Sequence, residues 1–158
     1  GMKVVWWGSD AGRARAKADG ETVPESRAAF FGTCDVVSLH LRLTSETRGS
    51  VTADDLGAMP PRSVLVNTSR AGLIAEGALL QALNAGHLGA AAVDVFDFEP
   101  LTDPSDPLLS HPKMIATPHI GFVTEDEFDK QFADIFEQVN AYAAGAPIHM
   151  INPSVYAP

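Results

Sequence analysis

Short aliphatic runs alternate with segments of helical periodicity along this chain. Five runs are bounded by polar, glycine or proline residues, and each predicts a strand. These runs are Lys3–Trp7, Asp35–His40, Ser63–Asn67, Leu88–Val95 and Met114–Ala116. Because helical segments separate the runs, the pattern indicates a parallel sheet covered by helices. We therefore predict an α/β fold with a doubly wound parallel sheet.

The segments between these runs carry start and stop signals for helices. The predicted helices are Ala11–Ala18, Pro24–Phe31, a short helix capped by Thr52, Ala75–Ala85, and a long helix from Thr124 to about Ala144. Pro60 and Pro61 stop the short helix, and Gly32 and Gly86 are suited to end their helices. Thr124 and Glu127 have the spacing of a capping box. The loop 97–112 holds four prolines and is expected to be irregular and exposed.

Composition narrows the classes of function. The chain has 158 residues, of which 46% are hydrophobic, enough for a domain with its own core. Its formal charge of −9 would repel a phosphate backbone, which argues against nucleic-acid binding. The single cysteine, Cys34, excludes an internal disulfide and a multi-cysteine metal site. No apolar run reaches membrane-spanning length and the N-terminus is too short for a signal peptide, so we expect a cytoplasmic protein without membrane partners.

Polar residues follow the predicted strands at the edge where open parallel sheets bind ligands. They are Asn67-Thr68-Ser69-Arg70, Asp94, Glu99 and His119. Each has an ordinary structural explanation when taken alone. Arg70 could be a surface charge, Asp94 a turn cap, Glu99 a solvated loop residue and His119 a satisfied histidine at a turn.

Taken together, three of these residues suggest a reaction. The guanidinium of Arg70 offers a fork of donors that matches a carboxylate. A glutamate such as Glu99 beside His119 would favour the protonated imidazole near neutral pH. The set could therefore reduce a 2-oxo acid by anchoring its carboxylate and protonating its carbonyl oxygen.

Blocks of this sequence resemble, in the same order, the D-isomer-specific 2-hydroxyacid dehydrogenase family. The blocks are Val37–Thr44 with Thr47, Leu65–Gly72, Ala92–Phe96 with Glu99-Pro100, and Ala116–Gly121. The resemblance implies a Rossmann-like dinucleotide-binding domain with NAD as cofactor. It also implies an oxidoreductase that transfers a hydride between the nicotinamide and a small 2-hydroxy or 2-oxo acid.

The resemblance assigns roles to individual residues. Arg70 would anchor the substrate, Glu99 would hold and tune the histidine, and His119 would act as general acid and base. Asp94 would accept a hydrogen bond from the nicotinamide carboxamide. The residues implied in cofactor binding are Asp10, Leu41, Thr68, Ser69, Arg70, Asp94, His119, Ile120 and Gly121. No histidine, aspartate or glutamate spacing indicates a metal site.

The chain also departs from the family pattern. The family's glycine-rich turn and most of its substrate domain do not occur in it, so the chain resembles the C-terminal half of such an enzyme. Residues 1–121 would form the dinucleotide-binding domain, incomplete at its N-terminus. Residues 122–158 would be a long helix and tail that return toward the substrate domain.

Other departures concern the cofactor. Gly8 occupies a position where the family often has an acid that binds the adenosine ribose, and Asp10 is the nearest substitute. Arg13 or Arg15 could accept a 2′-phosphate, so NADP stays open beside NAD. Arg42 replaces the family's usual proline, and Ala71 its usual glycine.

Two alternatives belong to other functional classes. The chain could be an NAD-binding interaction module of the corepressor type, although it contains no recognisable partner-recognition segment. It could also be an inactive fragment of a dehydrogenase. The sequence leaves the oligomeric state open; a homodimer is one option, since related enzymes are commonly dimers through the cofactor domain.

Overall fold

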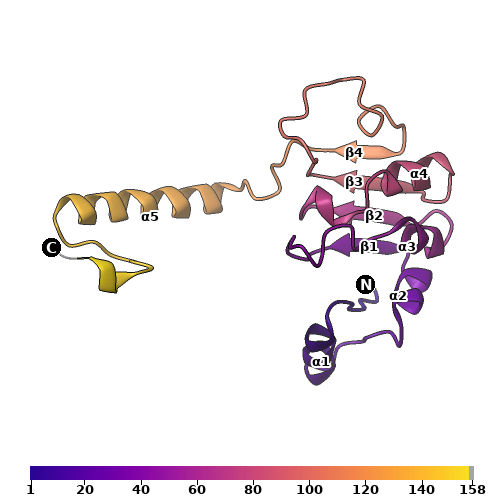
Figure 1. Ribbon diagram of the computed structural model, residues 1–158, viewed down its shortest axis with the longest axis horizontal. Coiled ribbons are helices and arrows are strands. Elements are labelled where there is room, and N and C mark those ends of the chain that lie inside the picture. The colour runs from indigo at the N-terminus through magenta and orange to yellow at the C-terminus, as the bar shows by residue number, and fades with distance from the viewer. Residues whose placement is uncertain (157–158) are drawn as a thin grey trace. The chain divides into compact units, whose positions relative to one another are not determined.

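The computed structural model describes residues 1–156, which form two compact units. The first unit comprises Gly1–His119, and the second begins at Ile120. The first contains a sheet of four parallel strands in the order β1-β2-β3-β4 (Figure 1). The strands are β1 (Val36–Leu39), β2 (Val64–Asn67), β3 (Ala90–Val93) and β4 (Met114–Ala116). The parallel, Rossmann-like α/β fold class predicted from the sequence is confirmed.

The strand register places the carboxyl ends of the strands side by side. One row across the sheet pairs Leu39 with Asn67, Asn67 with Val93, and Val93 with Ala116. The loops after β2, β3 and β4 therefore leave the sheet from the same edge. The polar site residues predicted from the sequence lie on these loops.

The predicted strand Lys3–Trp7 is wrong, because this segment is extended chain outside the sheet. Its backbone bond runs from the Trp6 N–H to the Thr22 carbonyl, at 2.9 Å, and Thr22 belongs to no strand. A run of apolar residues forms a strand only where a neighbouring strand completes its hydrogen-bond ladder.

Helices connect these elements, with bounds close to those predicted. They are α1 (Asp10–Ala18), α2 (Arg27–Thr33), α3 (Ala53–Ala58), the 3₁₀ turn η1 (Ala71–Leu73) and α4 (Ala78–Asn84). Helix α2 starts later than the predicted Pro24 because the Ser26 hydroxyl caps it by accepting the Ala29 N–H. Helix α4 starts later than the predicted Ala75 because Ala75 donates its N–H to the Val51 carbonyl, at 2.8 Å.

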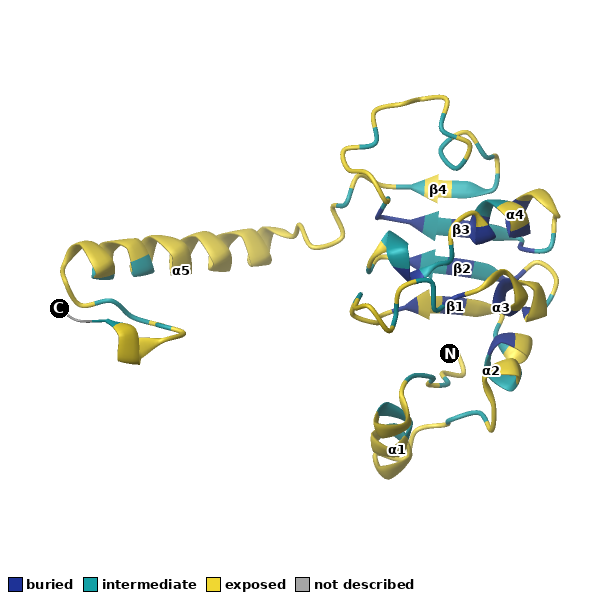
Figure 2. Cartoon of the chain, viewed as in Figure 1, coloured by how far each residue is buried: buried dark blue, intermediate teal, exposed yellow. Residues whose placement is uncertain are grey.

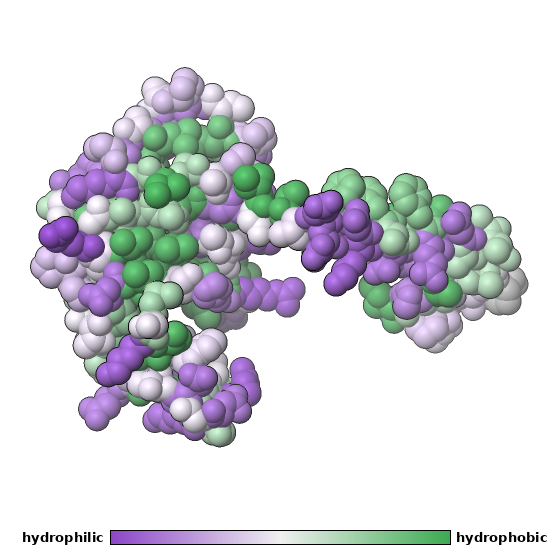
Figure 3. All heavy atoms as spheres, turned by 180° about the vertical axis from the view of Figure 1, so that it is seen from behind, coloured by the Kyte–Doolittle hydropathy of each residue, from purple (hydrophilic) through white to green (hydrophobic). Residues whose placement is uncertain are grey.

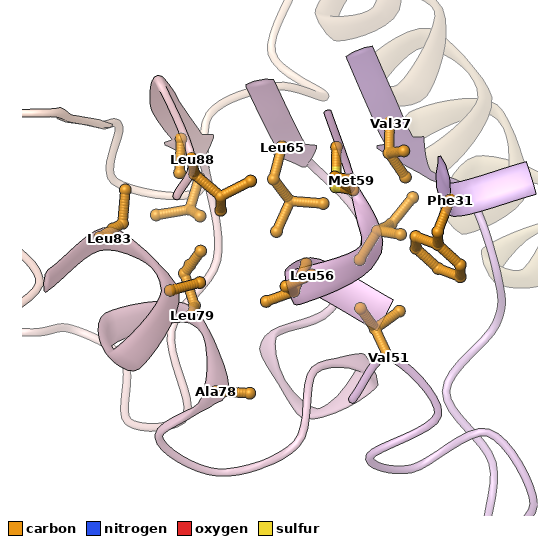
Figure 4. Close-up of a cluster of buried hydrophobic side chains, with 14 of the residues drawn as sticks. Phe31, Val37, Val51, Leu56, Met59, Leu65, Ala78, Leu79, Leu83 and Leu88 are labelled. Atoms are coloured by element: carbon orange, nitrogen blue, oxygen red, sulfur yellow. The ribbon is translucent and has the colours of Figure 1, made fainter. Parts of the chain in front are cut away.

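The core lies between one face of the sheet and helices α2, α3 and α4. Buried side chains from these helices point toward those of β1 and β2 (Figure 4). Burial alternates along β1, where Val37 is 2% exposed and its neighbour Val36 is 49% exposed (Figure 2). This alternation identifies the face of the sheet that packs against helices.

Two stretches of backbone meet closely at the opposite, amino-terminal edge of the sheet. The Gly89 N–H donates to the Ser63 carbonyl at 2.8 Å. A Cβ atom on Gly89 would lie 2.3 Å from the carbonyl oxygen of Arg62, closer than any side chain allows. Glycine is therefore required where the chain enters β3.

The second unit consists of the helix α5 (Glu125–Ala143), a tail and the 3₁₀ turn η2 (Pro153–Val155). Its predicted N-cap is confirmed, because the Thr124 hydroxyl accepts the Glu127 N–H at 3.2 Å. The capping box is only half formed, because the Thr124 N–H makes no bond to the Glu127 carboxylate. That carboxylate accepts from the Gln131 side chain instead. Large hydrophobic side chains are exposed along α5: Phe128, Phe132, Ile135, Phe136, Val139 and Tyr142. Figure 3 shows green surface over this unit.

No helix within residues 1–156 combines the length and apolar character needed to cross a bilayer. The last two residues of the predicted tail lie outside the described residues.

Candidate active site

The loop after β2 is organised by the side chain at the end of that strand. The Asn67 side chain accepts the Ser69 N–H at 3.1 Å and donates to the Arg70 carbonyl at 3.0 Å. The Ser69 hydroxyl in turn donates to the Leu41 carbonyl at 2.7 Å, which joins this loop to the one after β1. Arg70 itself is exposed, and its Nη1 donates to the Ser69 carbonyl at 2.6 Å. The guanidinium therefore extends from a firmly held turn.

The loop after β3 holds the two candidate carboxylates, Asp94 and Glu99, in different environments. Asp94 is 4% exposed and accepts a hydrogen bond from the Thr117 hydroxyl, while its N–H donates to the Asn67 carbonyl at 3.0 Å. Glu99 is more exposed, and its Oε1 accepts the Phe96 N–H at 2.8 Å. This backbone bond fixes the orientation of the Glu99 carboxylate within its own loop.

His119 stands three residues after the end of β4 and meets Glu99. Its Nδ1 lies 2.6 Å from Glu99 Oε2, and each of the two side chains is about one third exposed. The φ of His119 is +54°, a left-handed conformation that few non-glycine residues adopt. Such a backbone outlier is often found at functional sites.

The two side chains line a pocket of about 440 Å³. Most of the other residues that line it are apolar, namely Phe96, Pro100, Leu101, Leu109, Ala116 and Pro118. The remaining lining residue is Thr117. A pair of ionisable groups on the wall of an otherwise apolar pocket is a common arrangement for small-molecule chemistry.

The electrostatics join Glu99 to both cationic candidates. Hydrogen bonds from His119 and from the Phe96 N–H lower the pKa of Glu99, and the charges of His119 and Arg70 lower it further. Glu99 therefore stays ionised over a wider pH range than an isolated glutamate. The carboxylate and the imidazole thus pair at one edge of the sheet, and the charge of Arg70 acts on the same carboxylate, although the three residues are distant in sequence.

The predicted site residues fall into three groups. Arg70, Glu99 and His119 interact as described, and Leu41, Ser69 and Asp94 join them through hydrogen bonds between neighbouring loops. Thr68 is exposed in the loop after β2. Ile120 and Gly121 directly follow His119 and open the second unit.

Asp10 is not brought to this edge. It begins α1, which lies on the β1 side of the sheet, opposite β4 (Figure 1). Its carboxylate pairs with Arg13 at 2.5 Å, and the Arg13 guanidinium lies 4.4 Å from the centre of the Trp7 ring. Arg13 also donates to the Gly8 carbonyl at 2.5 Å, so several of its donors are already engaged.

Three features of the site escaped the sequence analysis: the side-chain clamp of Asn67, the Thr117 hydroxyl on Asp94, and the Phe96 N–H on Glu99. The first had a visible signal, since an asparagine at the end of a buried strand commonly bonds to the backbone two residues later. A backbone donor such as Phe96 leaves no signal in residue type.

Comparison with known proteins identifies the family of the chain. The model of the NAD-binding domain of D-isomer specific 2-hydroxyacid dehydrogenases matches residues 1–121. The chain belongs to this family. The predicted family and the predicted cofactor, NAD, are thereby confirmed.

Individual relatives of this dehydrogenase family match over much of the chain. D-3-phosphoglycerate dehydrogenase of Bacillus subtilis (strain 168) is 38% identical over 152 residues, covering 85% of this chain and 29% of that protein. Glyoxylate reductase of Aeropyrum pernix is 32% identical over 156 residues, covering 98% of this chain and 46% of that protein. The chain thus spans less than half the length of both relatives.

A solved structure supports the same assignment. The crystal structure of phosphoglycerate oxidoreductase from Vibrio cholerae O395 superposes with a TM-score of 0.84 and 44% identity. The match covers 92% of this chain and 46% of that one.

The donor and acceptor groups at the carboxyl edge fit a dinucleotide. Asp94 contributes a buried carboxylate to this edge, and the hydroxyls of Thr68 and Ser69 lie in the loop after the neighbouring strand. This is the edge at which doubly wound sheets bind nucleotides. Among residues 1–156, no group of three or more histidine, cysteine, aspartate or glutamate residues could hold a metal ion.

Proposed function

We propose that this chain supplies the cofactor-binding domain and the acid–base residues of an oxidoreductase acting on 2-hydroxy and 2-oxo acids. The observation that carries the proposal is the contact between His119 Nδ1 and Glu99 Oε2, at 2.6 Å, on the wall of a pocket and within the field of Arg70. Residues 1–121 would form the nucleotide-binding part, which is the range matched by the family model.

The proposed reaction divides the chemistry between the protein and its cofactor. When bound, NAD(H) supplies or accepts the hydride. Asp94, positioned by Thr117, would accept a hydrogen bond from the carboxamide and so orient the ring. Thr68, Ser69 and Leu41 would line the rest of the cofactor site within the first unit.

His119 would move the proton. Because Glu99 engages Nδ1, proton transfer would take place at Nε2. In reduction, His119 donates a proton to the oxygen at C2 of the 2-oxo acid; in oxidation, it accepts the hydroxyl proton. The Glu99 carboxylate holds the imidazole ring through its Nδ1 and so orients Nε2.

Arg70 would bind the substrate carboxylate. A guanidinium presents two parallel donors to a carboxylate, which a lysine cannot reproduce. The names of the relatives indicate the substrate class. 3-Phosphoglycerate is a 2-hydroxy acid whose oxidation gives a 2-oxo acid, and glyoxylate is itself a 2-oxo acid, so the assay with NADH uses 2-oxo acids.

The test uses the intact protein that carries this sequence. We expect saturable NADH binding, and NADH oxidation with at least one of glyoxylate, pyruvate, hydroxypyruvate and 3-phosphohydroxypyruvate. NADH binding without turnover on any of them would favour an NAD-binding interaction module. Absence of both signals would contradict the proposed function.

Substitution of the anchor sharpens this test. Arg70→Lys should lower kcat/KM roughly 10–100-fold, because a point charge replaces a bidentate contact. Arg48→Lys is the matched control. The Arg48 guanidinium lies beside Gly72 of η1, the 3₁₀ turn that directly follows Arg70, and has no proposed role. Equal kinetic constants for Arg70→Lys and the wild type would contradict the role of Arg70.

A further inference from the structure

Asn67 is one of the few polar residues buried within the first unit. It is 1% exposed and ends β2. Its side-chain amide bonds to the loop on both sides of the Ser69–Arg70 peptide, accepting from the Ser69 N–H and donating to the Arg70 carbonyl. The proposed reaction assigns no chemical role to this side chain.

The two side-chain bonds of Asn67 fix the backbone from which Arg70 extends. The Arg70 Nη1 donates to the Ser69 carbonyl at 2.6 Å, so the guanidinium rests on an atom of the same clamped segment. Ser69 is also tied to the Leu41 carbonyl through its hydroxyl. The direction of the guanidinium thus follows from the plane that the Asn67 amide holds in place.

Only an amide side chain satisfies both partners. Asparagine carries an acceptor and a donor on one planar group, which match an N–H and a carbonyl respectively. An aspartate would keep the acceptor but would place a second oxygen against the Arg70 carbonyl. A serine is shorter and would reach one partner at most.

We propose that Asn67 is a positioning residue for the substrate carboxylate, acting through the orientation of Arg70. This inference rests on the proposed function, in which Arg70 binds that carboxylate. The main-chain carbonyl of Asn67 also accepts the Asp94 N–H at 3.0 Å, a bond that side-chain substitution leaves in place. Asn67→Asp also keeps an acceptor for the N–H of Ser69, the residue that would line the cofactor site, and loses only the donor to the Arg70 carbonyl. The predicted effect of this substitution therefore falls on Arg70 and the substrate.

The first experiment measures steady-state kinetics of Asn67→Asp in the intact protein. We expect the KM for the 2-oxo acid to rise about tenfold, which corresponds to about 1.4 kcal/mol. We also expect kcat to change less than threefold and the KM for NADH to stay unchanged, because the substrate anchor is displaced while the proton donor is not.

Leu65→Ala is the matched control. Leu65 is fully buried, lies two residues earlier on the same strand and faces the same side of the sheet. This variant should lower the unfolding temperature without raising the KM for the 2-oxo acid. If both variants raise that KM equally, the role of Asn67 is merely structural and the proposal fails. Should Asn67→Asp fail to fold, Asn67→Ser replaces it with the same expected pattern.

A double-substitution cycle separates this inference from the function on which it rests. If Asn67 acts through Arg70, adding Asn67→Asp to Arg70→Ala should cause no further loss of kcat/KM. Losses that multiply would overturn the positioning role while leaving Arg70 as the anchor. An Arg70→Ala variant with wild-type kinetics would instead overturn the proposed function.

Discussion

Two ion pairs in the first unit have similar N–O distances but lie in different surroundings. Arg27 binds Asp55 through two contacts, Nε to Oδ1 at 2.7 Å and Nη2 to Oδ2 at 2.6 Å. His119 meets Glu99 through one contact at 2.6 Å. The Asp55 side chain is 10% exposed and also caps α3 through Thr52, whereas Glu99 and His119 line a pocket.

Both carboxylates have a lowered pKa. Burial raises the pKa of Asp55, but hydrogen bonds from Arg27 and Thr52 bring it below its usual range. The pKa of Glu99 is lowered chiefly by its bond with His119. A shifted carboxylate therefore does not by itself identify a functional site. The pocket beside Glu99 and His119 distinguishes this pair from Arg27 and Asp55.

The largest effect is expected for His119→Asn. Asparagine tolerates the left-handed backbone at this position but cannot transfer a proton at neutral pH. We expect kcat to fall about 10²–10⁴-fold, the usual contribution of general acid–base catalysis, with NADH affinity nearly unchanged. Stopped assays and a fluorescence titration would measure the two quantities. His111→Asn, in the irregular loop before β4, is the control; equal losses of turnover and NADH affinity in His119→Asn would show that His119 is misassigned.

Glu99→Gln should have the next largest effect. Glutamine keeps an acceptor for the Phe96 N–H but removes the negative charge that faces His119. We expect kcat to fall by roughly 10²-fold, because the protonated imidazole loses its partner. The exposed acid Asp97 lies in the same loop, and Asp97→Asn should leave kcat unchanged. A Glu99→Gln variant as active as Asp97→Asn would place this pair in the structural class of Arg27 and Asp55.

Arg27→Met should show the opposite pattern. It leaves the Asp55 carboxylate without its cation, and we expect a loss of about 1–3 kcal/mol in the free energy of unfolding. Turnover and KM should remain within twofold of the wild type. Denaturant titration and steady-state kinetics measure these effects, with Arg15→Met on the exposed α1 as control. A large loss of turnover in a folded Arg27→Met protein would remove the contrast between the pairs.

The smallest effect is a dependence of this stability difference on pH. Because the pKa of Asp55 is lower in the folded protein than in the unfolded chain, its ionisation stabilises the fold above the unfolded value of about 4. That contribution is lost as the pH falls through the lowered pKa. The gap in unfolding temperature between wild type and Arg27→Met should be constant near neutral pH and shrink below about pH 4. A gap that widens in acid would reverse the assigned sign.

Much of the sheet could be predicted from residue types because aliphatic runs bounded by turn residues define short strands. Met114–Ala116 was predicted with its exact bounds. Lys3–Trp7 has a similar pattern and forms no strand, since pairing depends on a neighbour that no local pattern reveals. Helix α4 begins later than predicted for a related reason, because the Ala75 N–H bonds to the Val51 carbonyl.

The candidate site shows the same division. The charged side chains of Arg70, Glu99 and His119 could be identified from their order and from the strands they follow. The groups that orient them could not, because two of them are a backbone N–H and a buried amide whose partners are set by the folded loops. Residue type thus indicates which groups react, while tertiary structure determines how each is held.

The close approach at Gly89 has a practical consequence for mutational studies. Even a methyl group at this position would collide with the Arg62 carbonyl. In a saturation library screened for folded protein, we expect this position to reject every other amino acid, although it lies at the edge of the sheet remote from the pocket. Intolerance to replacement there would report how tightly two main chains touch and would say nothing about catalysis.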